Sequence, residues 1–279
     1  MKIVHISDLH FGLHDQSLIK PFLEDIFTLH PDVILISGDL TQRAKHWQFV
    51  EARFFFRELP GNVLVVPGNH DIPFYNPVAR LSKPFKRFEQ YVSAEFGCIY
   101  TDENVRILGL NSVNPRRIKN GKLHEEDFNK INTFFSKNAE ALNILFFHHN
   151  FDSVYDFHKP LENADQLLEC LKSSPVNIVC TGHLHYANLA LFKKKQQQVG
   201  LILHGGSLFC KRSKDLLNSY FVLEVIEQEC TIHWRAYKNT HFHLMKSCRF
   251  DFHQSAEQIS RLIEDSFGHP PVITPSDKS

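Results

Sequence analysis

The sequence predicts an α/β domain with mainly parallel strands, and two observations support this prediction. Short apolar runs at 2–7, 32–37 and 62–66 alternate with helical stretches around 18–29 and 46–58. Each of these apolar runs ends at a small or turn-forming residue that is followed by polar residues. Because strand, helix, strand order is typical of crossover units, we expect neighbouring strands to run parallel.

The chain continues with an irregular excursion and then with further strands and helices. Residues 72–97 contain three prolines and several aromatic residues, so we expect an excursion with a helix near 85–96 that could form a lid over a site. Further strands are predicted at 105–111, 143–147, 177–180, 200–204 and 220–226, with a last pair near 231–237, and helices near 125–137 and 165–173.

The C-terminal third suggests how the domain ends. The segment KKKQQQ at 193–198 lies between two β-like stretches and is expected to be an exposed hairpin tip. Apolar residues at helical spacing near the C-terminus predict an amphipathic helix. We therefore expect one domain over 1–252, an amphipathic helix over 253–268 and a disordered tail over 269–279.

Composition excludes several classes of protein. The 279 residues include 31 Lys and Arg and 31 Asp and Glu, so no global field favours nucleic acid or an anionic membrane. The six cysteines are scattered without a C-x-x-C pair, unlike a disulfide framework. The N-terminal apolar run is broken by His5 and Asp8, and no run approaches the roughly 18 apolar residues of a membrane span. We expect a cytoplasmic protein; a peripheral membrane contact and the oligomeric state stay open.

Five short polar motifs each follow a predicted strand. They are Asp8-Leu9-His10, Gly38-Asp39, Gly68-Asn69-His70-Asp71, His148-His149 and Gly182-His183-Leu184-His185. In an extended segment residues i and i+2 point the same way, so the two polar ends of D-x-H and of H-L-H can converge on metal ions. Open α/β sheets bind ligands at the carboxyl ends of their strands, where these motifs fall. Carboxylate, imidazole and amide ligands together suit manganese, iron or zinc better than calcium.

The ordered set D-x-H, G-D, G-N-H-D, H-H and G-H-x-H resembles that of the calcineurin-like metallophosphoesterase superfamily. The stretches HISDLHFG, GDLTQR and GNHD are similar to the bacterial branch that includes class III cyclic-nucleotide phosphodiesterases. The resemblance implies a four-layer αββα sandwich of two mixed sheets and an enzyme with two divalent metal ions, Mn²⁺, Fe²⁺/Fe³⁺ or Zn²⁺. Asn150 stands where the family usually has proline after the double histidine, a departure that concerns loop shape more than ligation.

The resemblance also implies a role for each motif residue. A metal-bridging hydroxide would attack the phosphate, so no protein nucleophile is needed. His70 would act beside the scissile phosphate with Asp71 as its orienting partner, and His149 would either support a metal ligand or be structural. The metal ligands would be Asp8, His10 and His185 at the first ion, Asn69, His148 and His183 at the second, and Asp39 between them.

Other polar residues carry weaker signals. Arg43 follows GDLTQ and Arg80 lies in the proline-rich excursion, so either could reach a substrate phosphate. His204 follows a predicted strand downstream of G-H-L-H and could line the site. The basic loop NPRRIKNGK, which includes Lys119, is expected to be a solvated turn.

The leading functional hypothesis is hydrolysis of small phosphodiesters, with cyclic nucleotides first. An alternative is a UDP-diacylglucosamine-type pyrophosphohydrolase or a phospholipid-like phosphodiesterase, which would need an apolar lid. A nuclease is disfavoured because the chain has no net charge and no long basic stripe. A non-catalytic scaffold is disfavoured because every expected ligand is present.

Overall fold

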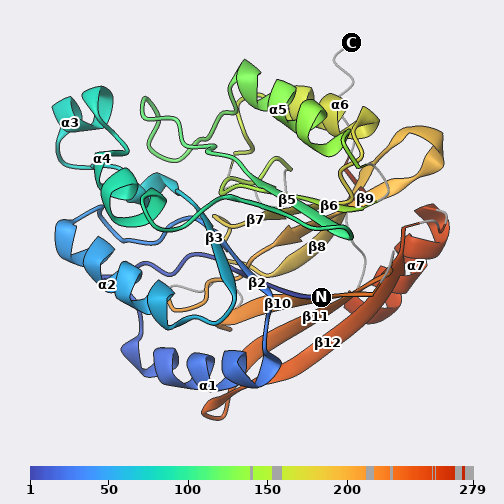
Figure 1. The fold of residues 1–279 in the computed structure, drawn as a ribbon, viewed down its shortest axis with the longest axis horizontal. Helices are drawn as coiled ribbons and strands as arrows, with labels where there is room; N and C mark the ends of the chain where they lie inside the picture. The colour runs from blue at the N-terminus through green and yellow to red at the C-terminus, as the bar shows by residue number, and fades with distance from the viewer. Residues whose placement is uncertain are drawn as a thin grey trace.

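Two β-sheets pack face to face between two pairs of helices in this computed structural model (Figure 1). Helices α1 (Ile19–Leu29) and α2 (His46–Glu58) cover the outer face of one sheet, and α5 (Glu125–Phe135) and α6 (Ala164–Ser173) cover the other. The predicted four-layer αββα sandwich of two mixed sheets is therefore confirmed. The structure describes residues 1–138, 141–152, 159–211, 217–226, 229–252, 254, 256–267 and 272–273.

The first sheet has six strands, of which the three from the N-terminal part of the chain run parallel. Its last three strands form an antiparallel meander beside them. The strand order is β12 (His241–Asp251), β11 (Glu229–Lys238), β10 (Ser219–Ile226), β1 (Lys2–Ile6), β2 (Val33–Ser37) and β3 (Asn62–Val66).

The second sheet has seven strands and a parallel centre. Antiparallel pairs lie toward each end, β8 with β9 and β4 with β5. The strand order is β13 (Val272–Ile273), β8 (Asn188–Lys193), β9 (Val199–His204), β7 (Ile178–Thr181), β6 (Leu142–Phe146), β5 (Val105–Gly109) and β4 (Ile99–Thr101).

Apolar side chains fill the three spaces between the four layers. The space between the sheets contains Leu35 and Phe146, which are fully buried. Phe22 of α1 and Phe135 of α5 are likewise fully buried under the outer helices. Each such side chain stabilises the fold by about 1.5–3 kcal/mol through burial. The central strands β2, β6 and β7 are buried on both faces, which explains why they read as continuous apolar runs.

The excursion at 72–97 contains a short helix that was not predicted, α3 (Pro77–Ser82). The helix predicted near 85–96 is present, because α4 (Lys86–Phe88) continues directly into a π-helical turn (Glu89–Ser93). Asn76 starts α3 by accepting a hydrogen bond from the Ala79 backbone N–H at 2.9 Å, and a proline occupies the first helical position.

Three strands lie outside the predicted ranges, namely β4, β12 and, in the tail, β13. The strand β4 has three residues, too few to show a period. The strand β12 lies at a sheet edge with most of its side chains exposed, so it lacks the apolar run that marks the other strands.

The hairpin tip predicted at 193–198 is confirmed, because β8 and β9 pair in antiparallel fashion with Lys193 opposite Val199. The C-terminal helix α7 (Ala256–Phe267) buries Ile259 and Ile263 in the core between the sheets. In the predicted tail, β13 pairs with β8, which differs from the expectation of disorder. Residues 253, 255 and 268 of the helical segment and the other tail residues lie outside the described part of the chain.

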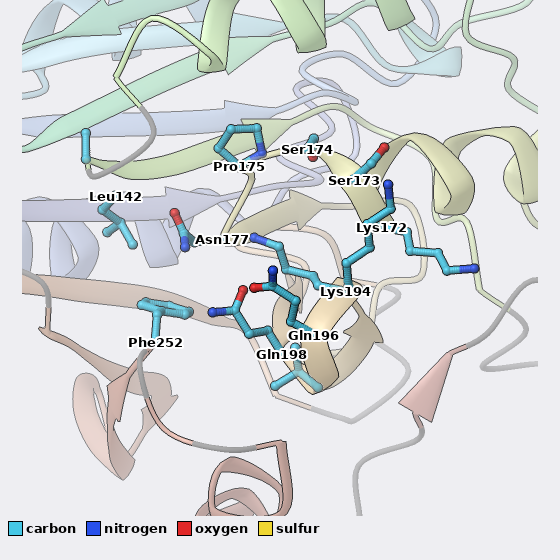
Figure 2. Close-up of a pocket in the computed structure, with 13 residues that line it drawn as sticks. Leu142, Lys172, Ser173, Ser174, Pro175, Asn177, Lys194, Gln196, Gln198 and Phe252 are labelled. Carbon is cyan, nitrogen blue, oxygen red and sulfur yellow. The ribbon is translucent and has the colours of Figure 1, made fainter.

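The carboxyl ends of the parallel strands and their amino ends lie at opposite edges of the sandwich. A pocket of about 520 Å³ lies at the amino end of the second sheet, where Lys194 extends toward Asn177 (Figure 2). The Lys194 ammonium donates to the Val176 carbonyl at 2.9 Å, and burial lowers its pKa to about 8. None of the polar motif residues lines this pocket.

Candidate metal centre

The motif residues leave their strands through strained backbone conformations. Asp8, His10, Asp39, His183 and His185 have φ values of 54°, 50°, 52°, 70° and 54°. Residues other than glycine rarely adopt this left-handed region, and such strain tends to cluster at functional sites. These backbone conformations direct the five side chains toward one another at the carboxyl edge of the sheets.

Glycines beside the motifs allow the loops to approach closely. A Cβ at Gly68 would lie 2.2 Å from a carboxylate oxygen of Asp39, and one at Gly182 would lie 1.9 Å from Ser7 Oγ. Gly38 has a φ of 84° and also has no room for a side chain. These three glycines are thus required for the close contact between loops.

The first group of candidate ligands consists of Asp8, His10, Asp39 and His185, whose ligand atoms lie within 4.8 Å of one another. The Nε2 atoms of His10 and His185 are 3.0 Å apart. His185 Nε2 lies 3.2 Å from Asp8 Oδ1. These side chains come from three different loops, so the fold alone brings them together.

The second group consists of Asp39, His148 and His183, with Asn69 beside them. The Nε2 atom of His148 lies 3.3 Å from Asp39 Oδ1 and 3.2 Å from Asn69 Oδ1. Its other ring nitrogen donates to the carbonyl of Ser37 at 2.8 Å, which fixes the ring and leaves Nε2 facing the group. Asp39 belongs to both groups and lies between them.

The residues of the first group fit a divalent cation. The Oδ2 atom of Asp8 accepts hydrogen bonds from Ser7 Oγ at 2.6 Å and from the His183 backbone N–H at 3.0 Å. Its Oδ1 atom is buried and has no hydrogen-bond partner among the described residues. A buried carboxylate oxygen without a partner is costly, and a cation would satisfy it. The mixed oxygen and nitrogen donors suit manganese, iron or zinc.

The electrostatics of the site favour cations beside its carboxylates. Burial alone would raise the pKa of Asp8 and Asp39, but the surrounding histidines hold both pKa values well below the ordinary range. Burial would lower the pKa of His148 and His185, yet Asp39 raises the first to about 9 and Asp8 raises the second to about 10. The carboxylates therefore draw positive charge to the places where cations would bind.

The pair His70 and Asp71 is arranged differently from its prediction. The Asp71 carboxylate accepts hydrogen bonds from the backbone N–H groups of Leu40, Thr41 and Gly68 at 2.8–3.1 Å. The Nδ1 atom of His70 instead donates to the Gln42 carbonyl at 2.9 Å. Asp71 therefore ties two motif loops together, and the Gln42 carbonyl orients the His70 ring. This corrects the role expected for Asp71.

The three weaker candidates have different outcomes. Arg43 lines the pocket at the motifs, and its guanidinium lies 4.8 Å from the centre of the Phe74 ring. Arg80 is buried and donates to three backbone carbonyls, including that of Pro115 at 2.8 Å, so it is committed to structure. His204 is fully buried and contacts Asp152 Oδ2 at 2.7 Å. Neither Arg80 nor His204 lines the pocket, which corrects their expected substrate-binding role.

His149 does not belong to either group of candidate ligands. It is buried, its Nδ1 lies 2.9 Å from Ser112 Oγ, and burial lowers its pKa to about 3. Its ring packs against that of His183, with centres 4.8 Å apart. His149 thus supports the position of His183, in line with the structural role expected for it.

Several pocket residues were missed by the sequence analysis. The pocket at the motifs has a volume of about 390 Å³. The basic loop around Lys119 is a sequence signal that could have suggested its place in the pocket. Gln42 and Ile118 belong to no motif and have no spacing that would mark them as pocket residues. Phe74 was visible only as one aromatic residue of the excursion, and Cys210 only as one of six scattered cysteines. All five line the pocket together with the motif residues.

The sequence model of the calcineurin-like phosphoesterase family matches residues 1–187. The chain belongs to this family. The match covers every motif and the strands that carry them. The chain is accordingly a phosphoesterase, a hydrolase of phosphate esters, and its family implies divalent metal ions.

Individual relatives are distant. A probable cyclic nucleotide phosphodiesterase of Vesicomyosocius okutanii is 25% identical over 203 residues, which cover 69% of this chain and 81% of the relative. The UDP-2,3-diacylglucosamine pyrophosphatase LpxG of Chlamydia trachomatis is 24% identical over 216 residues, covering 68% and 65% of the two chains. The purple acid phosphatase PPD1 of yellow lupin matches 99% of this chain and 57% of its own with a TM-score of 0.68 and 12% identity, a likeness of fold.

The helices give no sign of a membrane span. In the described ranges, no helix is both long and apolar enough to cross a bilayer.

Proposed function

We propose that the chain is a dinuclear metal-dependent phosphodiesterase that acts on small phosphodiesters, with cyclic nucleotides as the first candidate. The position of Asp39 carries this proposal. Its Oδ2 lies 3.7 Å from His10 Nε2 in the first group, and its Oδ1 lies 3.3 Å from His148 Nε2 in the second. A carboxylate shared by two ligand groups is what a site for two neighbouring cations needs.

In this proposal each of the two groups of candidate ligands would bind one metal ion. Two bound divalent cations would activate a water molecule near neutral pH and stabilise charge on the phosphate. The ligands are Asp8, His10 and His185 for the first ion, Asn69, His148 and His183 for the second, and Asp39 for both.

His70 is the proposed proton donor to the leaving oxygen. Its Nδ1–H is engaged by the Gln42 carbonyl, so Nε2 is the nitrogen that can pass a proton to the substrate. Its backbone N–H donates to Asp39 Oδ1 at 2.9 Å, which places the ring beside the shared carboxylate. The ring also packs edge-on against that of His10, with centres 4.9 Å apart. His70 can therefore protonate a group bound at the metals without being a ligand.

The pocket suits a small anionic substrate with a flat apolar part. Its volume of about 390 Å³ falls within the usual range for small-molecule sites. Arg43 and Lys119 bring positive charge to the pocket, although the chain as a whole has none in excess. Phe74 offers a ring on which a base can stack. A cyclic nucleotide combines such a base with one phosphodiester anion.

A second candidate is hydrolysis of a lipid-linked sugar nucleotide such as UDP-diacylglucosamine. One observation favours it: apolar side chains are exposed beside the pocket. Phe74 and Ile118 line the pocket, and Tyr75, Val78 and Leu81, which follow Phe74 in the chain, have exposed fractions of 63–75%. The pocket itself is too small for long acyl chains, so these would have to lie along this apolar rim.

Substrate tests with two variants separate these candidates. Wild-type protein with added manganese is assayed on cyclic nucleotides, an aryl phosphodiester, an aryl phosphomonoester, UDP-diacylglucosamine and linear DNA. Phe74→Ala should raise the KM for cyclic nucleotides if the base stacks on this ring. Leu81→Asp, outside the pocket, should impair only the acylated substrate, and cyclic nucleotide turnover is its control. No turnover of any diester with metal bound would contradict the proposal and favour a scaffold.

A further inference from the structure

Cys210 is held firmly beside the first motif. It follows β9 and is 1% exposed. Its backbone N–H donates to Ser207 Oγ at 3.1 Å, and its carbonyl accepts a hydrogen bond from Asn218 Nδ2 at 3.1 Å. Ser207 Oγ in turn donates to the carbonyl of Asp8 at 2.9 Å. These bonds fix Cys210 relative to the loop that carries the first candidate ligands.

The Cys210 thiol converges with the side chains of the first group. Its Sγ and a ring nitrogen from each of His10 and His185 lie within 4.8 Å of one another. The same two histidines form the group that contains Asp8 and Asp39. The buried Oδ1 of Asp8 lies 3.2 Å from His185 Nε2 and has no hydrogen-bond partner in the described part of the chain. The thiol and the Asp8 carboxylate thus belong to two groups that share the same two imidazoles.

The other five cysteines have different surroundings. Cys180, Cys230 and Cys248 lie in the apolar core between the sheets. Cys98 and Cys170 are half-buried and pack against core clusters. Within the described ranges, none of these five joins a group of metal-ligating side chains. The thiol that follows β9 is therefore distinct from an ordinary buried cysteine.

We propose that Cys210 supplies a thiolate ligand to the first metal ion, so that this position takes zinc or ferrous iron in preference to manganese. The inference rests on the proposed function, since it adds a ligand to the site proposed there. Soft thiolate ligands select zinc and iron, whereas manganese favours oxygen ligands. On binding, the sulfur forms a bond to the metal and the thiol proton is released to solvent.

The two metal positions would then differ in their ligands and in the metal that they prefer. The first position gains a sulfur ligand in addition to Asp8, His10 and His185. The ligands of the second position come from asparagine and histidine side chains with the shared Asp39. Zinc or ferrous iron is therefore expected to occupy the first position even when manganese is in excess, while the second position exchanges more freely.

X-ray absorption at the zinc edge tests this assignment directly. Wild-type protein loaded with two zinc ions should have one sulfur neighbour per two zinc ions, at about 2.3 Å. Cys210→Ser should lose this sulfur neighbour and bind its tighter zinc ion at least about tenfold more weakly, because even loss of a supporting contact costs roughly 10–100-fold. Cys170→Ser, a half-buried thiol away from the site, should keep both the sulfur neighbour and the zinc affinity.

Two results would overturn the assignment. The first is zinc-loaded wild-type protein without a sulfur neighbour, a result that does not depend on any variant folding. The second is a sulfur neighbour that persists in Cys210→Ser. If the protein binds two metal ions and hydrolyses diesters without metal–sulfur coordination, only the thiolate assignment fails. If it takes up no divalent metal, the proposed function fails with it.

Discussion

Replacing Ser7 by alanine should weaken metal binding without removing any candidate ligand. The hydroxyl of Ser7 donates to Asp8 Oδ2 at 2.6 Å, and the His183 backbone N–H donates to the same oxygen at 3.0 Å. These two bonds orient the carboxylate so that Oδ1 faces the first group. In Ser7→Ala one of the two donors is lost, and the Asp8 side chain gains freedom to turn away.

The size of the effect follows from the type of bond. A hydrogen bond to a charged group contributes about 1.5–3 kcal/mol. Since about 1.4 kcal/mol corresponds to a tenfold change in an equilibrium constant, the bond represents roughly 10- to 150-fold in affinity. Changes to residues that orient metal ligands usually cost about 10–100-fold. We therefore expect Ser7→Ala to bind its first metal ion about 10–100-fold more weakly.

Calorimetric titration of chelator-treated protein with manganese and with zinc measures this change. Ser219→Ala is the matched control, because Ser219 is also fully buried but its hydroxyl has no hydrogen-bond partner among the described residues. It should bind metal like the wild type. If Ser7→Ala binds both metal ions with wild-type affinity, the Asp8 carboxylate is not oriented by this bond or is not a ligand, and the reasoning is refuted.

Three further predictions concern neighbouring parts of the site. His70→Ala should keep both metal ions but lose about 10²–10⁴-fold in turnover of a diester with a poor leaving group; loss of both metals, measured by elemental analysis, would overturn the role proposed for His70. Gly68→Ala should destabilise the protein by about 1–3 kcal/mol in denaturant unfolding, because its Cβ would lie 2.2 Å from Asp39 Oδ1, whereas at Gly97 a Cβ has room and alanine should be neutral. His148 has its pKa raised from 6.5 to about 9 by Asp39 despite burial, so in metal-free protein its contribution to stability is full below pH 6.5 and is lost as the pH rises through 9. The Tm of chelator-treated protein should fall over this range, and a fall of equal size in His148→Gln would contradict that origin.

The positions of the parallel strands along the chain and the metal motifs could be predicted from the sequence because both leave local signals. Strands β1, β2 and β3 are buried on both faces, which gives continuous apolar runs. Candidate ligands such as Asp8 and His148 follow such runs directly. A cluster of polar residues directly after a buried strand is not needed for apolar packing, so the sequence alone indicates a site there.

The remaining features depend on contacts between distant parts of the chain. The role of Asp71 is set by backbone N–H groups of another loop, about 30 residues away, and no spacing rule predicts them. Arg80 donates hydrogen bonds to backbone carbonyls of the 115–117 loop. The presence of an arginine at this position therefore does not indicate substrate binding. Cys210 lies near His185 only because β7 and β9 are adjacent in the sheet. Sheet order of this kind is a property of the fold.

The central claim is that two cations held by one shared carboxylate, Asp39, carry out phosphodiester hydrolysis. Its most direct test adds manganese or zinc stepwise to chelator-treated protein and follows hydrolysis of an aryl phosphodiester at each step. We predict that turnover appears with the second equivalent of metal and that Asp39→Asn shows almost none at any metal concentration. Turnover in metal-free protein, turnover that is complete at one equivalent, or wild-type turnover in Asp39→Asn would contradict the account.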